Sequence, residues 1–510
     1  MLNYFSFGKI RIERGLLVML VLFLASLPFV TPRVAASDEI EYFSYLPSIL
    51  LDGDLNFRNQ YEYFCNRDPD DCVKSRFKET FLDLKTPTGL QINFGPLGTA
   101  VLWLPFYLVA HLVALVLQNF NPAFAANGIS TPYIYAVCVG SVFYGWLGIY
   151  LAYRIARHYF AEVTALGAAL VILFATNAVY YMYVAPAFSH AASLFASALF
   201  VYVWWRTRDS RAQGNWQSWI LLGASGGLMT MVREQEGVFF VIPLVEFLGV
   251  VYAAWRTRDN LAATHQGRHF ERSKAEREIS VLPREISATQ FVATPPRNDI
   301  RKLLKNWILG GVVMVGGAFV VFVPQFLVYR VLNGNFLPAR NVTDKFTWNG
   351  DHILDILFSN FHGLFTWTPV VLLAVAGLFF LWRRDKMLAA AFLVALAVET
   401  YLLGSFSTWF GGAAFGMRRF INCTVIFVVG LAAFAEALQT RVPRPVLAGV
   451  GALLILWNLF FILQFVTGMV PRQEPVDMLA MARNQIFAVP PRLFEIAQRF
   501  LTNRGSFYKQ

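Results

Sequence analysis

Long apolar stretches recur along almost the whole of this chain, and they constrain its fold more than any other feature. A helix of about 17 to 25 apolar residues matches the hydrocarbon thickness of a bilayer, and a helix satisfies its own backbone polar groups there. The sequence therefore predicts an all-α polytopic membrane protein with about eleven transmembrane helices. The expected spans are residues 15–34, 133–153, 161–183, 188–205, 216–232, 236–255, 305–331, 364–382, 387–404, 419–438 and 445–467.

Composition and charge agree with a membrane protein and argue against a nucleic-acid partner. Charged residues make up 15% of the chain, against about 25% in soluble domains, and the mean hydropathy is +0.49. The net charge is +11, but Lys and Arg gather in a few loops, as they do in cytoplasmic loops. No basic run outside the spans is interleaved with stacking aromatic residues, so we expect membrane lipids and no nucleic acid as partners.

A polar loop, residues 35–96, follows the first span and carries more acidic than basic residues. The positive-inside bias places such a loop outside the cytoplasm, with the N-terminus inside. Apolar residues recur at helical spacing over residues 42–50, which predicts an amphipathic helix on the membrane surface. In an oxidising compartment, Cys65 and Cys72 of this loop would form a local disulfide.

The apolar stretch 97–118 decides the topology. If it crosses the membrane, every later basic loop lies outside; if it is re-entrant or interfacial, all of them lie inside. Several basic loops outweigh one apolar window, so we expect 97–118 to be a non-crossing segment broken at Pro105. The C-terminal tail, residues 468–510, then lies outside.

Two other segments need an interpretation. Residues 9–37 also fit a cleavable signal peptide, but cleavage after Ala36 would leave the carboxylates that follow on a free end, so we favour an uncleaved anchor. Residues 256–304 are rich in Arg, Lys and Pro, which predicts a poorly ordered cytoplasmic loop near anionic headgroups.

The polar residues that could take part in catalysis or ligand binding gather on the expected outer face. Asp38 and Glu39 begin the polar loop, and a partly desolvated carboxylate there suits a general base. The alternative is that both acids cap the next helix, since acids favour helix N-termini. Arg233 lies at a turn of the chain, where it could bind a phosphate or pair with Glu234 or Glu236.

Other cations and histidines extend this candidate site. His190 begins a helix and is either a polar cavity residue or a structural histidine. Phosphate binding by one of the cations Arg340, Lys345, Arg418 and Arg419 is expected, and the sequence does not specify which one. His352 and His362 lack the spacing of metal ligands, so no metal site is predicted, and a divalent metal has no support in the sequence.

Several motifs in order resemble the C-type glycosyltransferase superfamily, with a layout similar to aminoarabinose transferases of lipid A and protein O-mannosyltransferases. They are Asp38-Glu39-Ile40-Glu41-Tyr42 after the first span, Asn93-Phe94-Gly95-Pro96-Leu97-Gly98, the Arg233 turn, and Trp409-Phe410-Gly411-Gly412 followed by Phe415-Gly416-Met417-Arg418. The resemblance covers a module of residues 1–260 well and the C-terminal helices, 305–467, loosely.

The resemblance implies inverting transfer of a sugar from a polyprenyl-phosphate donor to a lipid, glycan or protein acceptor. It implies a multi-pass protein of the bacterial inner membrane whose site faces the periplasm. Asp38, with Glu39 beside it, would be the base, and cations would stabilise the leaving phosphate. The substrate-binding residues would be Tyr42, Lys85, Asn93, His190, Arg233, Arg340, Lys345 and Arg418. His190 departs from relatives that often have Asp there.

Three other functions remain open at this point. A secondary transporter would also carry intramembrane acids such as Glu246, Glu399 and Glu436, but it should show internal repeats, which are not evident. An assembly scaffold gives no reason for charges to gather on one face. An oligosaccharide ligase with a diphosphate-linked donor would differ only in its leaving group.

Overall fold

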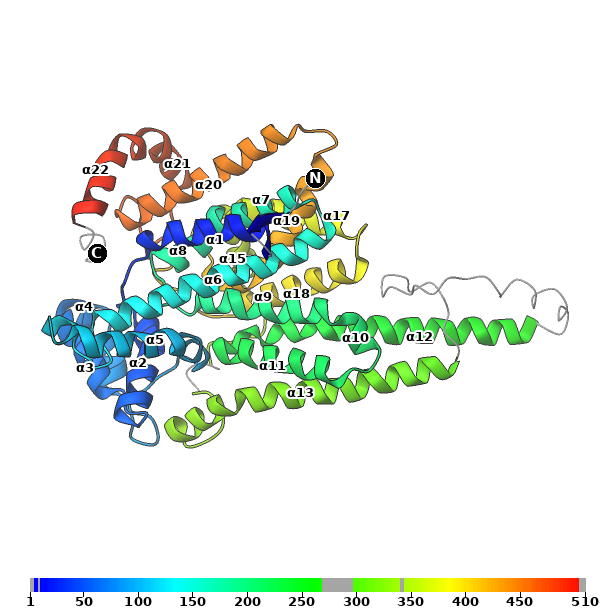
Figure 1. The fold of residues 1–510 in the computed structure, drawn as a ribbon, viewed down its shortest axis with the longest axis horizontal. Helices are drawn as coiled ribbons and strands as arrows, with labels where there is room; N and C mark the ends of the chain where they lie inside the picture. The colour runs from blue at the N-terminus through cyan, green and yellow to red at the C-terminus, as the bar shows by residue number, and fades with distance from the viewer. Residues whose placement is uncertain (1–3, 8–9, 268–296, 340–343, 504–510) are drawn as a thin grey trace.

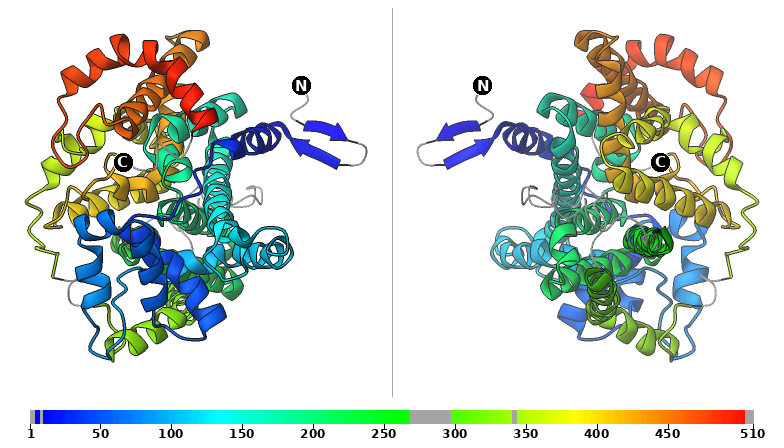
Figure 2. Two further views of the ribbon diagram at one scale, coloured as in Figure 1. Left: turned by 90° about the vertical axis from the view of Figure 1, so that its left-hand side faces the viewer. Right: turned by 90° about the vertical axis from the view of Figure 1, so that its right-hand side faces the viewer.

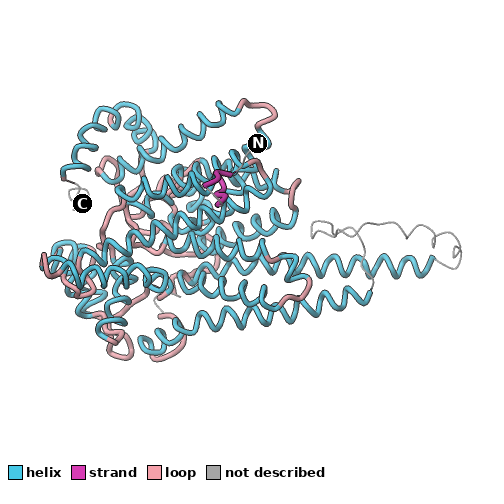
Figure 3. The backbone as a smooth tube through the Cα atoms, in the orientation of Figure 1, coloured by secondary structure: helices cyan, strands magenta, loops and turns pink. Residues whose placement is uncertain are grey.

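The computed structural model of the chain describes residues 4–7, 10–267, 297–339 and 344–503. Within these ranges the chain is helical almost throughout, and its two strands, β1 (Tyr4–Phe7) and β2 (Ile10–Glu13), form one antiparallel hairpin. Figure 3 shows how helices dominate the molecule. The predicted all-helical membrane fold is confirmed.

Each predicted span coincides with one helix or with two consecutive helices. These are α1 (Arg14–Ser26), α6 (Thr131–Tyr159), α7 (Glu162–Ala175) with α8 (Ala178–Tyr183), α9 (His190–Arg206), α11 (Trp216–Val232), α12 (Val241–Gly267), α13 (Arg297–Asn333), α16 (Leu364–Trp367) with α17 (Val370–Leu381), α18 (Lys386–Gly404), α19 (Thr424–Leu438) and α20 (Arg444–Val466). Seven helices of the described chain are long and apolar enough to cross a membrane, and three more are shorter and apolar. The number eleven therefore stays a prediction.

Glycines let the long helices pack closely. A Cβ atom on Gly377 of α17 would lie 1.8 Å from the carbonyl oxygen of Gly430 on α19. A Cβ atom on Gly223 of α11 would lie 2.1 Å from the carbonyl oxygen of Met314 on α13. Small residues at such crossings bring backbones together, which is how helices associate where lipid removes the hydrophobic driving force.

The polar loop 35–96 folds into α2 (Ser37–Pro47), α3 (Arg58–Arg67) and α4 (Pro69–Lys74) at one end of the molecule (Figure 1). All residues from 39 to 47 are buried, and α2 packs against α3 and α5 (Gly98–Leu117). The prediction of an amphipathic helix on the membrane surface is therefore wrong for α2. Apolar spacing reveals a buried face, but not whether lipid or protein covers it.

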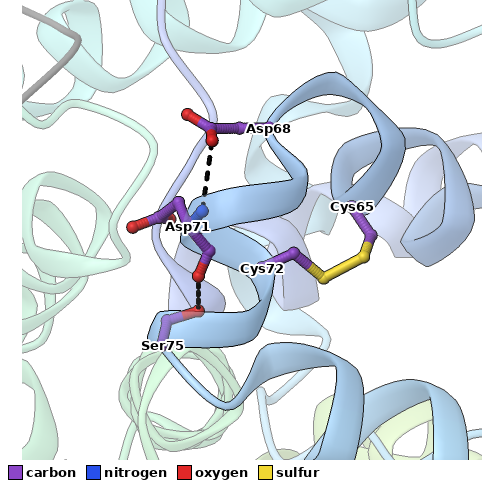
Figure 4. Close-up of a disulfide and its surroundings, with 5 residues drawn as sticks. All are labelled: Cys65, Asp68, Asp71, Cys72 and Ser75. Carbon is purple, nitrogen blue, oxygen red and sulfur yellow. Dashed lines mark hydrogen bonds between the residues drawn. A yellow bond between two sulfur atoms is a disulfide. The ribbon is translucent and has the colours of Figure 1, made fainter.

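A disulfide ties two of these outer helices together. Cys65 near the end of α3 is joined to Cys72 in α4, and the Asp68 carboxylate between them accepts from the Asp71 N–H at 3.1 Å, which caps α4 (Figure 4). The structure thus contains the pairing that the sequence allowed.

The segment 97–118 is one unbroken helix, α5, with Pro105 inside it, so the predicted break at this proline is wrong. Trp103 donates to Ser141 at 2.8 Å, and His111 lies 2.6 Å from the Tyr133 hydroxyl, so α5 runs antiparallel to α6. Both partners lie in the N-terminal half of α6, and α5 stays at the end of the molecule that holds α2 (Figure 1). α5 is long enough to cross, and its non-crossing placement stays a prediction.

The loop between helices α12 and α13 is shorter than the basic loop of residues 256–304 that the sequence predicted. Helix α12 continues to Gly267 and α13 already begins at Arg297, so both helices extend past their apolar stretches. The predicted poor order of the remaining residues, 268–296, lies outside the described residues.

The end of α9 opposite to His190 holds buried charges, which hydropathy alone does not reveal. Arg211 in α10 (Arg208–Ala212) is fully buried and pairs with Glu246 of α12 at 2.8 Å. Arg208 pairs with Asp385, just before α18, at 2.7 Å. These two arginines therefore tie helices together.

Candidate functional site

Asp38 and Arg418 form the centre of the candidate site. Asp38 lies in the first turn of α2, and its Oδ2 is 3.2 Å from Arg418 Nη2 at the start of η7 (Arg418–Cys423). The Asp38 side chain is 44% exposed and that of Arg418 is 18% exposed. The carboxylate is thus paired and still open to a substrate.

The chain before Arg418 is shaped to place this guanidinium. Gly411, Gly412 and Gly416 have φ values of 72°, 69° and 64°, in the left-handed region that favours glycine. The Phe415 N–H donates to the Tyr181 hydroxyl at 3.0 Å, which fastens the loop to α8. The Arg418 guanidinium then lies over the Phe188 ring, 4.9 Å from its centroid.

Arg233 is held by groups from the neighbouring helices. Its Nη1 lies 2.7 Å from His190 Nδ1, and its Nε lies 3.9 Å from Glu236 Oε1. Since a guanidinium can only donate, His190 must accept through Nδ1 and be neutral. Glu236 accepts in turn from the hydroxyls of Ser193 and Ser197 on α9.

Arg419 completes a cluster of three arginines. Its guanidinium lies 4.4 Å from the centre of the Phe406 ring, and it interacts electrostatically with Arg418, Arg233 and Asp38. Its Nη1 is buried and has no hydrogen-bond partner within the described part of the chain. Three guanidinium groups thus gather near the partly exposed Asp38 carboxylate, while the buried carboxylates of Glu236 and Glu399 interact with Arg233 and Arg419.

The two other acids of the motif support α2. Glu39 is fully buried, and its Oε2 accepts from the backbone N–H groups of Ala35 and Ala36 at 2.8 and 3.0 Å. Burial raises the pKa of Glu39 above its usual value. Glu39 therefore caps the helix, which was the alternative role predicted for the two acids. Asp38 next to it pairs with Arg418 instead.

Glu41, which was not expected as a site residue, fixes the turn that follows the polar loop. Its carboxylate accepts from the backbone N–H groups of Phe94 and Gly95. Burial, followed by the negative charge of Asp38, raises the pKa of Glu41 to about 8. The Asn93 side chain donates to the Glu41 carbonyl and accepts from Gly95, so Asn93 shapes this turn.

The remaining predicted residues divide into near and distant positions. Tyr42 is buried and forms a hydrogen bond with Ser189. Burial raises the pKa of Tyr42 to about 12, while the charge of Arg233 lowers this pKa and that of Asp38 raises it. Lys345 is exposed and acts electrostatically on Glu41. Lys85 is exposed and bonds to Gln91, with no contact to Asp38 or Arg418 in the described chain. Arg340 lies outside the described residues.

The structure therefore brings Asp38, Tyr42, His190, Arg233 and Arg418 together from four separate stretches of sequence. Arg419, one of the four cations that the sequence offered for phosphate binding, joins this group. Arg233 pairs with Glu236, one of its two expected partners, whereas Glu41 was missed as a support of the site. Within the described residues, no group of three or more His, Cys, Asp or Glu side chains is placed to hold a metal ion.

Comparison with known proteins gives one family match. Residues 128–264 match the family of dolichyl-phosphate-mannose-protein mannosyltransferases. No curated protein sequence matches the chain. Among solved structures, the archaeal oligosaccharyltransferase AglB from Archaeoglobus fulgidus, in complex with an inhibitory peptide and a dolichol-phosphate, is similar with a TM-score of 0.37 and 13% identity. The alignment covers 93% of this chain and 54% of that chain, so this chain spans about half the length of that protein. The family match thus covers about a quarter of the chain, and over these residues the chain is similar to dolichyl-phosphate-mannose-protein mannosyltransferases.

Proposed function

We propose that this protein transfers a sugar from a polyprenyl-phosphate donor to an acceptor hydroxyl at the outer side of the membrane, with inversion. The observation that carries the proposal is the pairing of Asp38 with Arg418 inside a cluster of arginines. A partly exposed carboxylate next to three arginines supplies both functions that this reaction needs, a base and a phosphate site. The family match supports glycosyl transfer as the class of reaction.

Asp38 is the proposed base. Its Oδ atoms take the proton of the acceptor hydroxyl while the acceptor oxygen attacks C1 of the sugar. The bond between C1 and the phosphate oxygen breaks on the opposite face of the sugar, and the lipid phosphate leaves with the electron pair. One displacement of this kind inverts the configuration at C1.

The arginines are the proposed phosphate site. Negative charge develops on the departing phosphate, and preorganised positive groups stabilise it most where water is excluded. Arg418 and Arg233 are both largely buried, with 18% and 14% of their side chains exposed. Arg419 adds a buried guanidinium nitrogen that has no hydrogen-bond partner in the described chain.

The site needs both halves of the chain. Asp38, His190 and Arg233 belong to the module of residues 1–260, whereas Arg418 and Arg419 come from the C-terminal helices. We therefore propose that residues 305–467 contribute two of the three arginines of the phosphate site, in addition to spanning the membrane. The module alone would have the base but would lack two of the three arginines.

Two observations support a site on the outer, periplasmic side of a bacterial inner membrane. Asp38 begins the acidic loop that the positive-inside bias places outside. The same loop carries the Cys65–Cys72 disulfide, and disulfides persist in oxidising compartments such as the periplasm.

The proposal is tested by transfer of labelled sugar in proteoliposomes that contain the purified protein. Donors with a polyprenyl monophosphate and with a polyprenyl diphosphate are offered separately, with lipid, glycan and peptide acceptors. Labelled product from the monophosphate donor is expected. Product from the diphosphate donor alone would point to an oligosaccharide ligase, and no product from any donor would contradict glycosyl transfer.

A further inference from the structure

The C-terminal helix α22 (Val489–Thr502) has two chemically distinct faces. Its apolar side chains recur every three or four residues, whereas Arg492, Glu495, Gln498 and Arg499 share the opposite side. The apolar side consists of Val489, Leu493, Phe494, Ile496, Ala497, Phe500 and Leu501.

Much of this apolar face has no protein cover. Phe494 is 81% exposed and Leu501 is 82% exposed. The preceding helix α21 (Met478–Phe487) adds Ile486 and Phe487, which are 67% and 71% exposed. Large apolar side chains that gather on one surface mark a place where something other than water covers them.

Contacts to the spans hold α21 against the C-terminal half of α20 and α22 against Phe29, just after α1. In α21, Gln485 donates to the Trp457 carbonyl of α20, and the Met481 carbonyl accepts from Gln464 of α20, both at 3.1 Å. The Phe500 ring of α22 stacks on Phe29, just after α1, with 5.8 Å between centroids. Helix α22 therefore bridges the ends of two apolar helices.

The direction of α22 also differs from that of the spans. The long helices run along the molecule, whereas α22 runs across them, at the end where α2 and α3 lie (Figure 1). The end-on views show α21 and α22 as an arc at the edge of the molecule (Figure 2). A helix that runs across the spans at one end of them has the orientation of a helix at a bilayer surface.

We propose that α22 is an in-plane membrane anchor, whose apolar face is covered by the acyl chains of the outer leaflet. Its basic side chains, Arg492 and Arg499, then lie on the headgroup side, where they favour anionic lipids. The occupant is the lipid of the same membrane, because α22 is held against α20 and against Phe29 at the end of α1, two of the predicted spans. This goes beyond the proposed sugar transfer and does not depend on it.

The anchor also connects to the candidate site. Phe29, on which Phe500 stacks, opens the short segment that leads from α1 into α2 and Asp38. Lipid contact of α22 thus fixes the depth at which this segment leaves the membrane.

The test places nitroxide spin labels on the full-length protein in vesicles of phosphatidylcholine and phosphatidylglycerol. Phe494→Cys and Leu501→Cys report on the apolar face, and Gln498→Cys on the polar face of the same helix is the matched control. Power saturation compares the accessibility of each label to oxygen, which partitions into lipid, and to a water-soluble nickel chelate. The native chain, taken through the same labelling reaction, measures the background, because its free cysteines Cys138 and Cys423 are buried.

Labels at positions 494 and 501 are expected to shift towards oxygen, and the label at 498 towards the nickel chelate. Equal access of the nickel chelate to all three positions would overturn the proposal. Labels at 494 and 501 that are shielded from both reagents, with dipolar broadening between copies, would show a second protein chain as the occupant and would also overturn it.

Discussion

Arg418 and Asp38 form an ion pair at 3.2 Å although 380 residues separate them in the sequence. Arg418 begins η7 between α18 and α19, and Asp38 lies in the first turn of α2, after the first span. The pair therefore joins the N-terminal module to the C-terminal helices at the site.

Replacement of Arg418 should weaken catalysis more than folding. Arg418→Ala is expected to lower kcat by roughly 10²- to 10³-fold, because a preorganised group that stabilises developing charge is lost. Arg418→Lys should restore only part of it, since an ammonium cannot bind a phosphate with two parallel hydrogen bonds. The measurement is the rate of labelled-sugar transfer, with the exposed Arg383→Ala as control. Equal rates for Arg418→Ala and the control would contradict a role in the phosphate site.

His190 should act through Arg233. Loss of the acceptor in His190→Leu leaves the guanidinium misplaced, and a hydrogen bond to a charged group is worth about 1.5 to 3 kcal/mol, or roughly 10- to 100-fold in kcat/KM. His190→Asn keeps an acceptor and should retain more activity than His190→Leu. The measurement is kcat/KM for the donor in both variants. Equal loss of activity in two folded variants would contradict a role of the His190–Arg233 hydrogen bond in placing the guanidinium.

Glu41 should make stability depend on pH. Burial raises its pKa in the native state to about 8, so the native carboxyl keeps a proton that the unfolded chain releases above its ordinary value of 4.5. Its contribution to stability is fully present below pH 4.5 and is lost as the pH rises through 8. We expect the Tm in detergent to fall between pH 5 and 8 for the wild type, and to fall less for Glu41→Gln.

The control for Glu41 is Glu62→Gln, at a carboxylate with 46% of its side chain exposed on α3. This variant should follow the wild type over the same pH range. A Glu41→Gln curve that falls as steeply as the wild type would show that another group carries the pH dependence.

Helix α5 should have both ends on one side of the membrane. Asn119→Cys, in the turn after α5, should react with a membrane-impermeant maleimide from the same side as Asp54→Cys in the loop before it. Arg383→Cys, between α17 and α18, should react only from the opposite side. Reaction of Asn119→Cys from the side of Arg383→Cys would show that α5 crosses.

The positions of the long helices could be predicted from the sequence because hydropathy is a local property. The 15–34 and 133–153 stretches, for example, became α1 and α6, which begin within two residues of the predicted starts, although α1 ends eight residues earlier and α6 six residues later than predicted. The prediction of a break at Pro105 was wrong because a proline removes only one backbone hydrogen bond from the helix. An apolar helix packed on a neighbour tolerates this loss.

The site could be predicted only in part. Asp38 and Arg233 stand next to recognisable boundaries, where a charge at the end of an apolar stretch is conspicuous. The partners of these groups depend on packing between distant segments, so the Arg418–Asp38 and Arg233–His190 contacts could not be read from spacing. The different roles of Glu39 and Asp38 depend on which way each side chain points from the first turn of α2, which the sequence does not specify.

The most direct test of the central claim is the single-turnover rate of sugar transfer by Asp38→Asn. This variant keeps the shape of the side chain and removes its ability to take a proton. The account predicts that kcat falls by roughly 10²- to 10⁴-fold, while donor binding to the folded variant persists. Transfer at the wild-type rate by a folded Asp38→Asn would contradict the assignment of Asp38 as the base.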